Sequence, residues 1–150
     1  MRAATAMQPD QVPWPRRPEL SLAALPTAPS CARGHVRSVV SEWGLGGLAE
    51  TAQLLTSELV TNALQASQRL RSRVNVATVP VIRLWLTSDG ISMIIHVWDA
   101  SDEMPVLKDS AADDENGRGL MLVAALGKDW GCYRKAEGKV VWVMITGADP

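Results

Sequence analysis

Apolar residues recur at three- and four-residue steps in two neighbouring stretches of the sequence, which is the spacing of an amphipathic helix. The first stretch begins at Ser30, whose side chain can cap a helix, and is followed by Gly44, which can end one. The second stretch, residues 48–70, is longer and carries apolar residues along one side, at Leu48, Ala52, Leu55, Leu59, Ala63 and Ala66. The pattern therefore predicts two consecutive helices.

After residue 80 the period shortens to that of β-strands. The segment "PVIRLWLTSDGISMIIHVWDA" predicts a hairpin with its turn at residues 88–90, and "DWGCYRKAEGKVVWVMITG" predicts a second hairpin with its turn near "AEGK". Between the hairpins lie an acidic loop without periodicity, residues 101–117, and a short apolar helix, "RGLMLVAALG". Strands joined by tight turns are antiparallel neighbours. The order of elements therefore predicts an α+β fold, an α/β sandwich in which helices cover one face of a sheet.

Residues 1–29 differ from the rest of the chain in composition, because they hold most of its nine prolines. Proline fits neither a helix interior nor a central strand. The composition predicts a flexible N-terminal arm over residues 1–29 and one domain over residues 30–150.

Charge and composition narrow the class of function. The formal net charge of −1 argues against a protein that binds nucleic acid through bulk charge. No run of 18 apolar residues is present, and the N-terminus lacks the continuous apolar core of a signal peptide. We therefore expect a cytoplasmic protein with no membrane contact. Two cysteines and two histidines are too few for a zinc site, and His96, inside an apolar run, is expected in the core.

Three short motifs carry candidate chemistry, and the first lies in the second predicted helix. Glu58 and Asn62 are four residues apart in "SELVTNA", so they share a helix face at the edge of the apolar stripe. A carboxylate and a carboxamide at that edge need partners, and a hard cation such as Mg²⁺ takes oxygen ligands. The alternative is a solvated pair on the flank of the helix.

The second motif, "VWDASDEMP", ends an apolar strand abruptly at Asp99. A buried carboxylate there could accept a hydrogen bond from an amine of a ligand, and leaving such an acceptor unpaired costs about 1–3 kcal/mol. The alternative is a turn closed by the aspartate's own side chain.

The third motif is "GRGL" at the start of the short apolar helix. Gly117 and Gly119 let backbone N–H groups approach a polyanion closely, and a helix start offers unpaired N–H groups and the positive end of the helix dipole. Arg118 adds a guanidinium that can grip phosphate oxygens. The motif matches neither the P-loop nor the dinucleotide fingerprint, because neither the G-K-[ST] run nor the third glycine is present.

Taken in order, these motifs resemble the three boxes of the GHKL ATPase superfamily, the gyrase, histidine-kinase and MutL type. Within it, the chain is most similar to the small anti-sigma-factor serine/threonine kinases, over roughly residues 30–147. The resemblance implies a Bergerat-type ATP-binding fold, in which helices cover one face of a mixed, mostly antiparallel sheet.

The resemblance also implies roles for individual residues. "ELVTNA" corresponds to the N box, so Asn62 would coordinate Mg²⁺ and Glu58 would be the general base or orient the attacking hydroxyl. The ATP phosphates would meet the second glycine box, which is made of Gly117, Arg118, Gly119 and Leu120.

"DASDEMP" corresponds to the first glycine box, with Ser101 where other branches carry glycine. Asp99 would accept a hydrogen bond from the exocyclic amine of adenine, and Pro105 would shape the start of an ATP lid over residues 106–116.

Two departures from the family pattern bear on activity. Related N boxes often carry a supporting histidine where Ala66 stands, which puts the rate of phosphoryl transfer in question. Val140 and Val141 stand where many relatives place a threonine near the adenine, so one contact to the base is missing.

The leading hypothesis is an ATP- and Mg²⁺-dependent kinase that phosphorylates a serine or threonine of an anti-sigma-factor antagonist, sequesters a sigma factor, or does both. The family also allows a homodimer. The second hypothesis is a binding module that has lost catalysis and acts through protein contacts. A dinucleotide-binding oxidoreductase is disfavoured, because the βαβ order is missing.

Overall fold

The computed structural model describes residues 19–74, 78–104 and 115–147, with backbone alone for residues 73–74 and 115–120. In chain order the elements are β1 (Leu20–Ala23), α1 (Ala28–Glu42), the short 3-10 helix η2 (Gly46–Leu48), α2 (Ala49–Val74), β2 (Val81–Ser88), β3 (Ser92–Asp99), α3 (Glu115–Leu126), β4 (Asp129–Lys135) and β5 (Gly138–Thr146).

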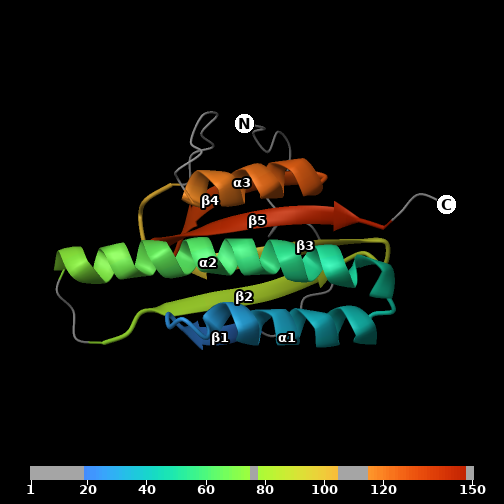
Figure 1. Ribbon diagram of the computed structural model, residues 1–150, viewed down its shortest axis with the longest axis horizontal. Coiled ribbons are helices and arrows are strands. Elements are labelled where there is room, and N and C mark those ends of the chain that lie inside the picture. Colours follow the sequence, from blue (N-terminus) through green and yellow to red (C-terminus); the bar gives the residue numbers. More distant parts are fainter. Residues whose placement is uncertain (1–18, 75–77, 105–114, 148–150) are drawn as a thin grey trace.

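The five strands form one sheet in the order β1-β2-β3-β5-β4, and all four pairings are antiparallel. The helices lie side by side over the same face of this sheet, with α2 between α1 and α3 (Figure 1). The α+β sandwich expected from the order of elements is therefore confirmed.

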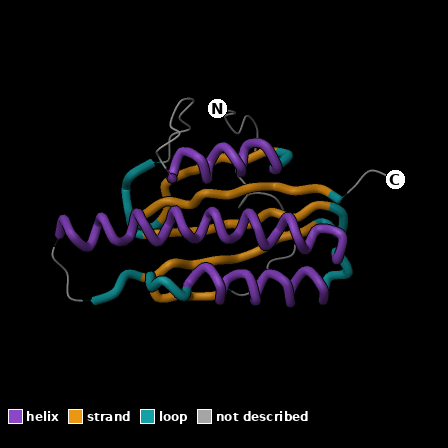
Figure 2. The backbone as a smooth tube through the Cα atoms, in the orientation of Figure 1, coloured by secondary structure: helices purple, strands orange, loops and turns teal. Residues whose placement is uncertain are grey.

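The main core fills the space between the helices and the sheet. The apolar stripe predicted for the second helix faces this core along its whole length, since Leu48, Ala52, Leu55, Leu59, Ala63 and Ala66 are all buried. The strands contribute the alternate residues that point toward the helices, such as Leu84, Ile95 and Val143, and α3 contributes Val123. The backbone tube in Figure 2 shows why the stripe must be long, because α2 runs along the full length of the strands. None of the helices in the described part of the chain is both long and apolar enough to cross a membrane.

Two boundaries near the N-terminus differ from the sequence-based expectation. Residues 20–23, placed in the arm by the proline content, form β1, which pairs with the edge of β2. The strand is only four residues long and buries one side chain, Leu22, so its alternation was too short to stand out. Helix α1 begins at Ala28 instead of Ser30, because Pro29 occupies the first turn, where its fixed φ and missing N–H suit a helix. Residues 1–18 of the predicted arm lie outside the described residues.

The opposite face of the sheet carries a second apolar cluster that the sequence analysis did not anticipate. Trp85, Ile94, Val140 and Trp142 are buried there, and the Trp85 and His96 rings stack at a centroid distance of 5.0 Å. His96 lies in this layer fully buried, with Nε2 3.0 Å from Thr87 Oγ1, as expected for a core histidine. The central strands are therefore apolar on both faces.

Candidate functional site

The helix α2 presents Glu58 and Asn62 at the edge of its buried stripe. Both side chains are half-buried, while Leu59 and Ala63 beside them are in the core. This is the position predicted from their spacing. One residue before Glu58, Ser57 Oγ accepts a hydrogen bond of 2.7 Å from Arg33 Nη1 of α1. That bond ties the two helices together where the candidate catalytic carboxylate stands.

Asp99 is the last residue of β3 and is buried on the helix-covered face, with 2% of its surface exposed. Its Oδ1 accepts a hydrogen bond of 2.8 Å from the backbone N–H of Ser101, which is the side-chain turn considered as the alternative above. The same oxygen accepts a second bond of 2.9 Å from Lys139 Nζ. The turn and a buried carboxylate acceptor therefore coexist, and the role of Asp99 toward a base stays a prediction.

Lys139 is a member of this site that the sequence analysis missed. It is the second residue of β5, lies directly opposite Asp99 in the β3–β5 register, and is 4% exposed. A signal was present in the sequence, since "GKVVWVMI" places one cation inside a buried apolar strand. Such a charge requires a buried partner, but only the register identifies that partner as Asp99.

Burial dominates the electrostatics of Asp99. It raises the pKa of Asp99 above the ordinary value of 3.8, while the Lys139 ammonium and the Ser101 N–H lower it and the Glu103 carboxylate raises it further. The Cys132 thiol is also affected: burial raises its pKa and Lys139 acts in the opposite direction. Lys139 is thus the cation that offsets the cost of ionising the Asp99 carboxyl.

The segment after β3 is fixed to α2 by polar contacts. Ser101 is fully buried, and its Oγ accepts a hydrogen bond of 3.1 Å from the Glu103 N–H. The Glu103 carboxylate in turn pairs with Arg69 of α2 at 3.1 Å. The first glycine box therefore leaves the sheet along α2. Pro105 and most of the expected lid lie outside the described residues.

The sequence predicted a helix that starts at Arg118, which would place Gly117 before it. In the structure, the second glycine box lies within α3. The helix begins at Glu115, so the N–H of Gly117 lies in its first turn, among the N–H groups without an intrahelical partner. Gly119 and Leu120 follow inside the helix, where the N–H of Gly119 is in line with the carbonyl of Glu115. Of the two glycine amides expected to meet phosphate, that of Gly117 is therefore available at the helix start, whereas that of Gly119 lies within the helical hydrogen-bond pattern.

The fold brings the three motifs onto elements that touch one another. Helix α2, with the N box, packs against both β3, which ends in Asp99, and α3, which carries the second glycine box. Of the two valines at the expected threonine position, Val141 shares the helix-covered face with Asp99, whereas Val140 belongs to the opposite cluster. Only Val141 is therefore on the side of a base bound at Asp99.

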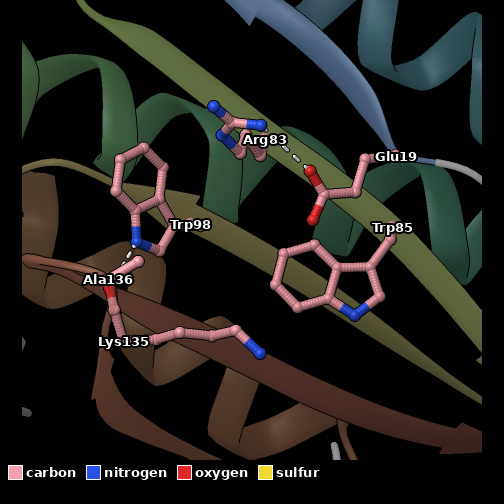
Figure 3. Close-up of a pocket in the computed structure, with 6 residues that line it drawn as sticks. All are labelled: Glu19, Arg83, Trp85, Trp98, Lys135 and Ala136. Atoms are coloured by element: carbon pink, nitrogen blue, oxygen red, sulfur yellow. Dashed lines mark hydrogen bonds and ion pairs between the residues drawn. The ribbon is translucent and has the colours of Figure 1, made fainter.

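A separate pocket of about 250 Å³ opens on the opposite face of the sheet (Figure 3). Arg83 pairs with Glu19 at 3.3 Å and lies 5.6 Å from the centre of the Trp98 ring. The Trp98 indole N–H donates to the Lys135 carbonyl at 2.7 Å, and the Lys135 ammonium lies 5.9 Å from the centre of the Trp85 ring. None of the predicted site residues whose side chains the structure describes lines this pocket.

The comparison with protein families agrees with this arrangement. A family model described as the histidine kinase-like ATPase domain matches residues 22–145. The chain therefore belongs to the histidine kinase-like ATPase domain family, and ATP binding is the function that this family implies. The match begins within β1, ahead of the residue 30 boundary. A comparison with curated protein sequences finds no match.

The residues in place fit an adenine nucleotide and a hard cation. Glu58 and Asn62 are half-buried oxygen donors on one turn of α2, and Mg²⁺ uses few protein oxygens because it keeps waters and phosphate oxygens as ligands. Asp99 is a buried acceptor, as a base amine requires. The family assignment and the donor set therefore point to the same ligand.

Proposed function

We propose that this protein binds ATP with Mg²⁺ and transfers the γ-phosphate to a serine or threonine of a partner protein in bacterial signalling. The observation that carries the proposal is the buried Asp99 carboxylate at the end of β3, next to a helix that presents Glu58 and Asn62. The family match to a histidine kinase-like ATPase domain supports it.

Each residue then has a defined role. Asp99 accepts a hydrogen bond from the exocyclic amine of adenine, and Asn62 holds Mg²⁺, which when bound neutralises charge on the phosphates. The N–H groups at the start of α3, together with Arg118, meet the phosphate oxygens. The hydroxyl oxygen of the partner forms a bond to the γ-phosphorus as the bond to the oxygen of leaving ADP breaks. Glu58 orients that hydroxyl and accepts its proton.

The partner is proposed from the family resemblance. An anti-sigma-factor antagonist would receive the phosphate, and a sigma factor would be held through a protein surface. Such a protein acts in the cytoplasm, and the family resemblance allows a homodimer.

A non-catalytic binding module is the second candidate, and one observation favours it. Ala66 stands where related N boxes carry a supporting histidine, and it is buried at 3% exposure, so no polar group acts from that position. In that case the nucleotide would be held and not cleaved.

A labelling experiment distinguishes the kinase from the binding module. Purified protein is incubated with Mg²⁺, γ-labelled ATP and a candidate antagonist. The kinase proposal predicts label on a serine or threonine of the antagonist. It also predicts a loss of at least about 100-fold in rate for Glu58→Gln, because a positioned base contributes roughly 10²–10⁴-fold. A fold check by circular dichroism and an ATP-binding measurement accompany the variant. Tight ATP binding without label on any antagonist tested would support the binding module instead.

A further inference from the structure

Lys139 is a lysine buried in the sheet, beside the proposed base site. It is 4% exposed, and its ammonium reaches one oxygen only among the described contacts, Asp99 Oδ1 at 2.9 Å. A buried ion pair is weak support for a fold, since apolar residues of similar volume are often equally stable there or more so. The pair therefore suggests a task other than stability.

The two hydrogen bonds to Asp99 both end on Oδ1. One comes from Lys139 Nζ and the other from the Ser101 backbone N–H at 2.8 Å. Within the described part of the chain, no hydrogen bond to Oδ2 is found. One carboxylate oxygen is thus anchored by two donors, and the other is left to accept from a ligand.

The backbones of β3 and β5 lie unusually close together beside this pair. A Cβ at Gly138 would lie 2.1 Å from the carbonyl oxygen of Asp99 and 2.8 Å from the Trp98 ring. Strands β3 and β5 therefore approach each other more tightly here than a side chain would permit. Because Lys139 follows Gly138 directly, this approach fixes the position from which its side chain reaches Asp99.

We propose that Lys139 is the positioning residue that makes the site selective for a 6-aminopurine nucleotide. By anchoring Oδ1 and supplying a positive charge, it keeps Asp99 an ionised carboxylate, which can only accept hydrogen bonds. An acceptor at Oδ2 suits the amino group of adenine and repels the carbonyl oxygen of a 6-oxopurine. The inference rests on the proposed function and assigns its base selectivity to a residue outside the three motifs.

The charged environment makes this role measurable through pH. Three described groups surround the Asp99–Lys139 pair: the Glu103 carboxylate after β3, which raises the pKa of Asp99, the Cys132 thiol of β4, whose pKa Lys139 lowers, and Arg69 of α2, which pairs with Glu103. Burial is the largest cause that raises the pKa of Asp99, and Lys139 is the first of the groups that lower it. Without Lys139 the carboxyl would be protonated at a higher pH, and a protonated carboxyl can donate to a 6-oxopurine.

Calorimetric titration with Mg²⁺-ATP and Mg²⁺-inosine triphosphate between pH 5.5 and 8.5 tests the proposal. For the wild type, we expect ATP to bind at least about tenfold more tightly, because a 6-oxopurine would leave the buried acceptor without a donor. Lys139→Met should lose about tenfold in ATP affinity at pH 7, recover it as the pH rises, and discriminate less between the nucleotides. Lys139→Arg should behave like the wild type.

The variants also separate this role from a purely structural one. A structural loss would weaken both nucleotides equally at every pH, and that outcome for Lys139→Met would overturn the proposal. If Lys139→Met does not fold, Lys139→Gln keeps a donor to Oδ1 without the charge and should show the same pH dependence. Wild-type protein that binds neither nucleotide would overturn the proposed function as well, whereas unchanged selectivity in a variant that binds ATP would overturn only the role of Lys139.

Discussion

The pKa values of two aspartates in the β2–β3 hairpin shift in opposite directions because their surroundings differ. Asp89, exposed in the turn, accepts hydrogen bonds on Oδ1 from the N–H groups of Ile91 at 2.9 Å and Ser92 at 2.7 Å. The Ser92 bond is the main cause that lowers the pKa of Asp89 below 3.8. At the other end of the hairpin, burial raises the pKa of Asp99 despite a lysine partner. The same residue type therefore stabilises a turn at one end and forms a candidate ligand site at the other.

The lowered pKa of Asp89 predicts a pH-dependent contribution to stability. A carboxyl with a lowered pKa in the folded state contributes stability above its unfolded value, and this is lost as the pH falls through the folded value. We expect Asp89→Ala to reduce the free energy of unfolding by about 1 kcal/mol at pH 7 and by clearly less at pH 2.5. Urea denaturation of both proteins at the two pH values measures this, and an equal difference at both would contradict the role of the charge.

The polar residues of the N box could be predicted from sequence, whereas the pairing of Lys139 with Asp99 could not. Glu58 and Asn62 act within one helix, so a spacing of four residues is enough to place them on one face. Lys139 and Asp99 are forty residues apart in sequence and meet only because β3 pairs with β5. The β3–β5 pairing joins strands of two different hairpins, and the pattern of a single hairpin carries no information on which other hairpin it pairs with.

At the scale of elements, the hydrophobic periodicity predicted the two long helices and both hairpins. It missed the short strand β1 and the start of α3. The two helices and both hairpins follow from periods sustained over many residues. Strand β1 is four residues long and pairs on one side only, with β2. Its place in the sheet depends on that pairing, so its own short sequence does not indicate a strand. Helix α3 starts two residues before the glycines, because its packing on α2 outweighs the low helix propensity of glycine.

Two glycines in different elements should respond oppositely to the same substitution. A Cβ at Gly138 would meet the Asp99 carbonyl oxygen at 2.1 Å, and backbone cannot move aside cheaply, so Gly138→Ala should cost about 1–3 kcal/mol. A Cβ at Gly34, inside α1, meets nothing within 4 Å, so Gly34→Ala should add roughly 0.5–1 kcal/mol. Chemical denaturation of both variants measures the pair. A Gly138→Ala protein as stable as the wild type would show that β3 and β5 are not clamped at the site.

At the scale of the whole molecule, the sheet separates two surfaces with different chemistry. The helix-covered side holds the three motifs, with oxygen donors on α2 and a buried carboxylate on β3. The opposite side holds the aromatic cluster and the pocket lined by Arg83 and Lys135 (Figure 3). Because successive residues of a strand alternate between faces, Lys139 lies on the helix-covered face with Asp99, in the candidate nucleotide site, while its neighbour Val140 packs with Trp85 on the other side.

The central claim is that the helix-covered face binds Mg²⁺-ATP through Asp99, and nucleotide-dependent thermal stability tests it most directly. With Mg²⁺-ATP at about 100 times its dissociation constant, the wild type should gain about 2.7 kcal/mol in stability. Asp89→Ala, a matched change at the far end of the same hairpin, should gain as much over its own ligand-free form. Asp99→Ala should gain little or nothing. No gain for the wild type, or an equal gain for Asp99→Ala, would contradict the assignment of the site.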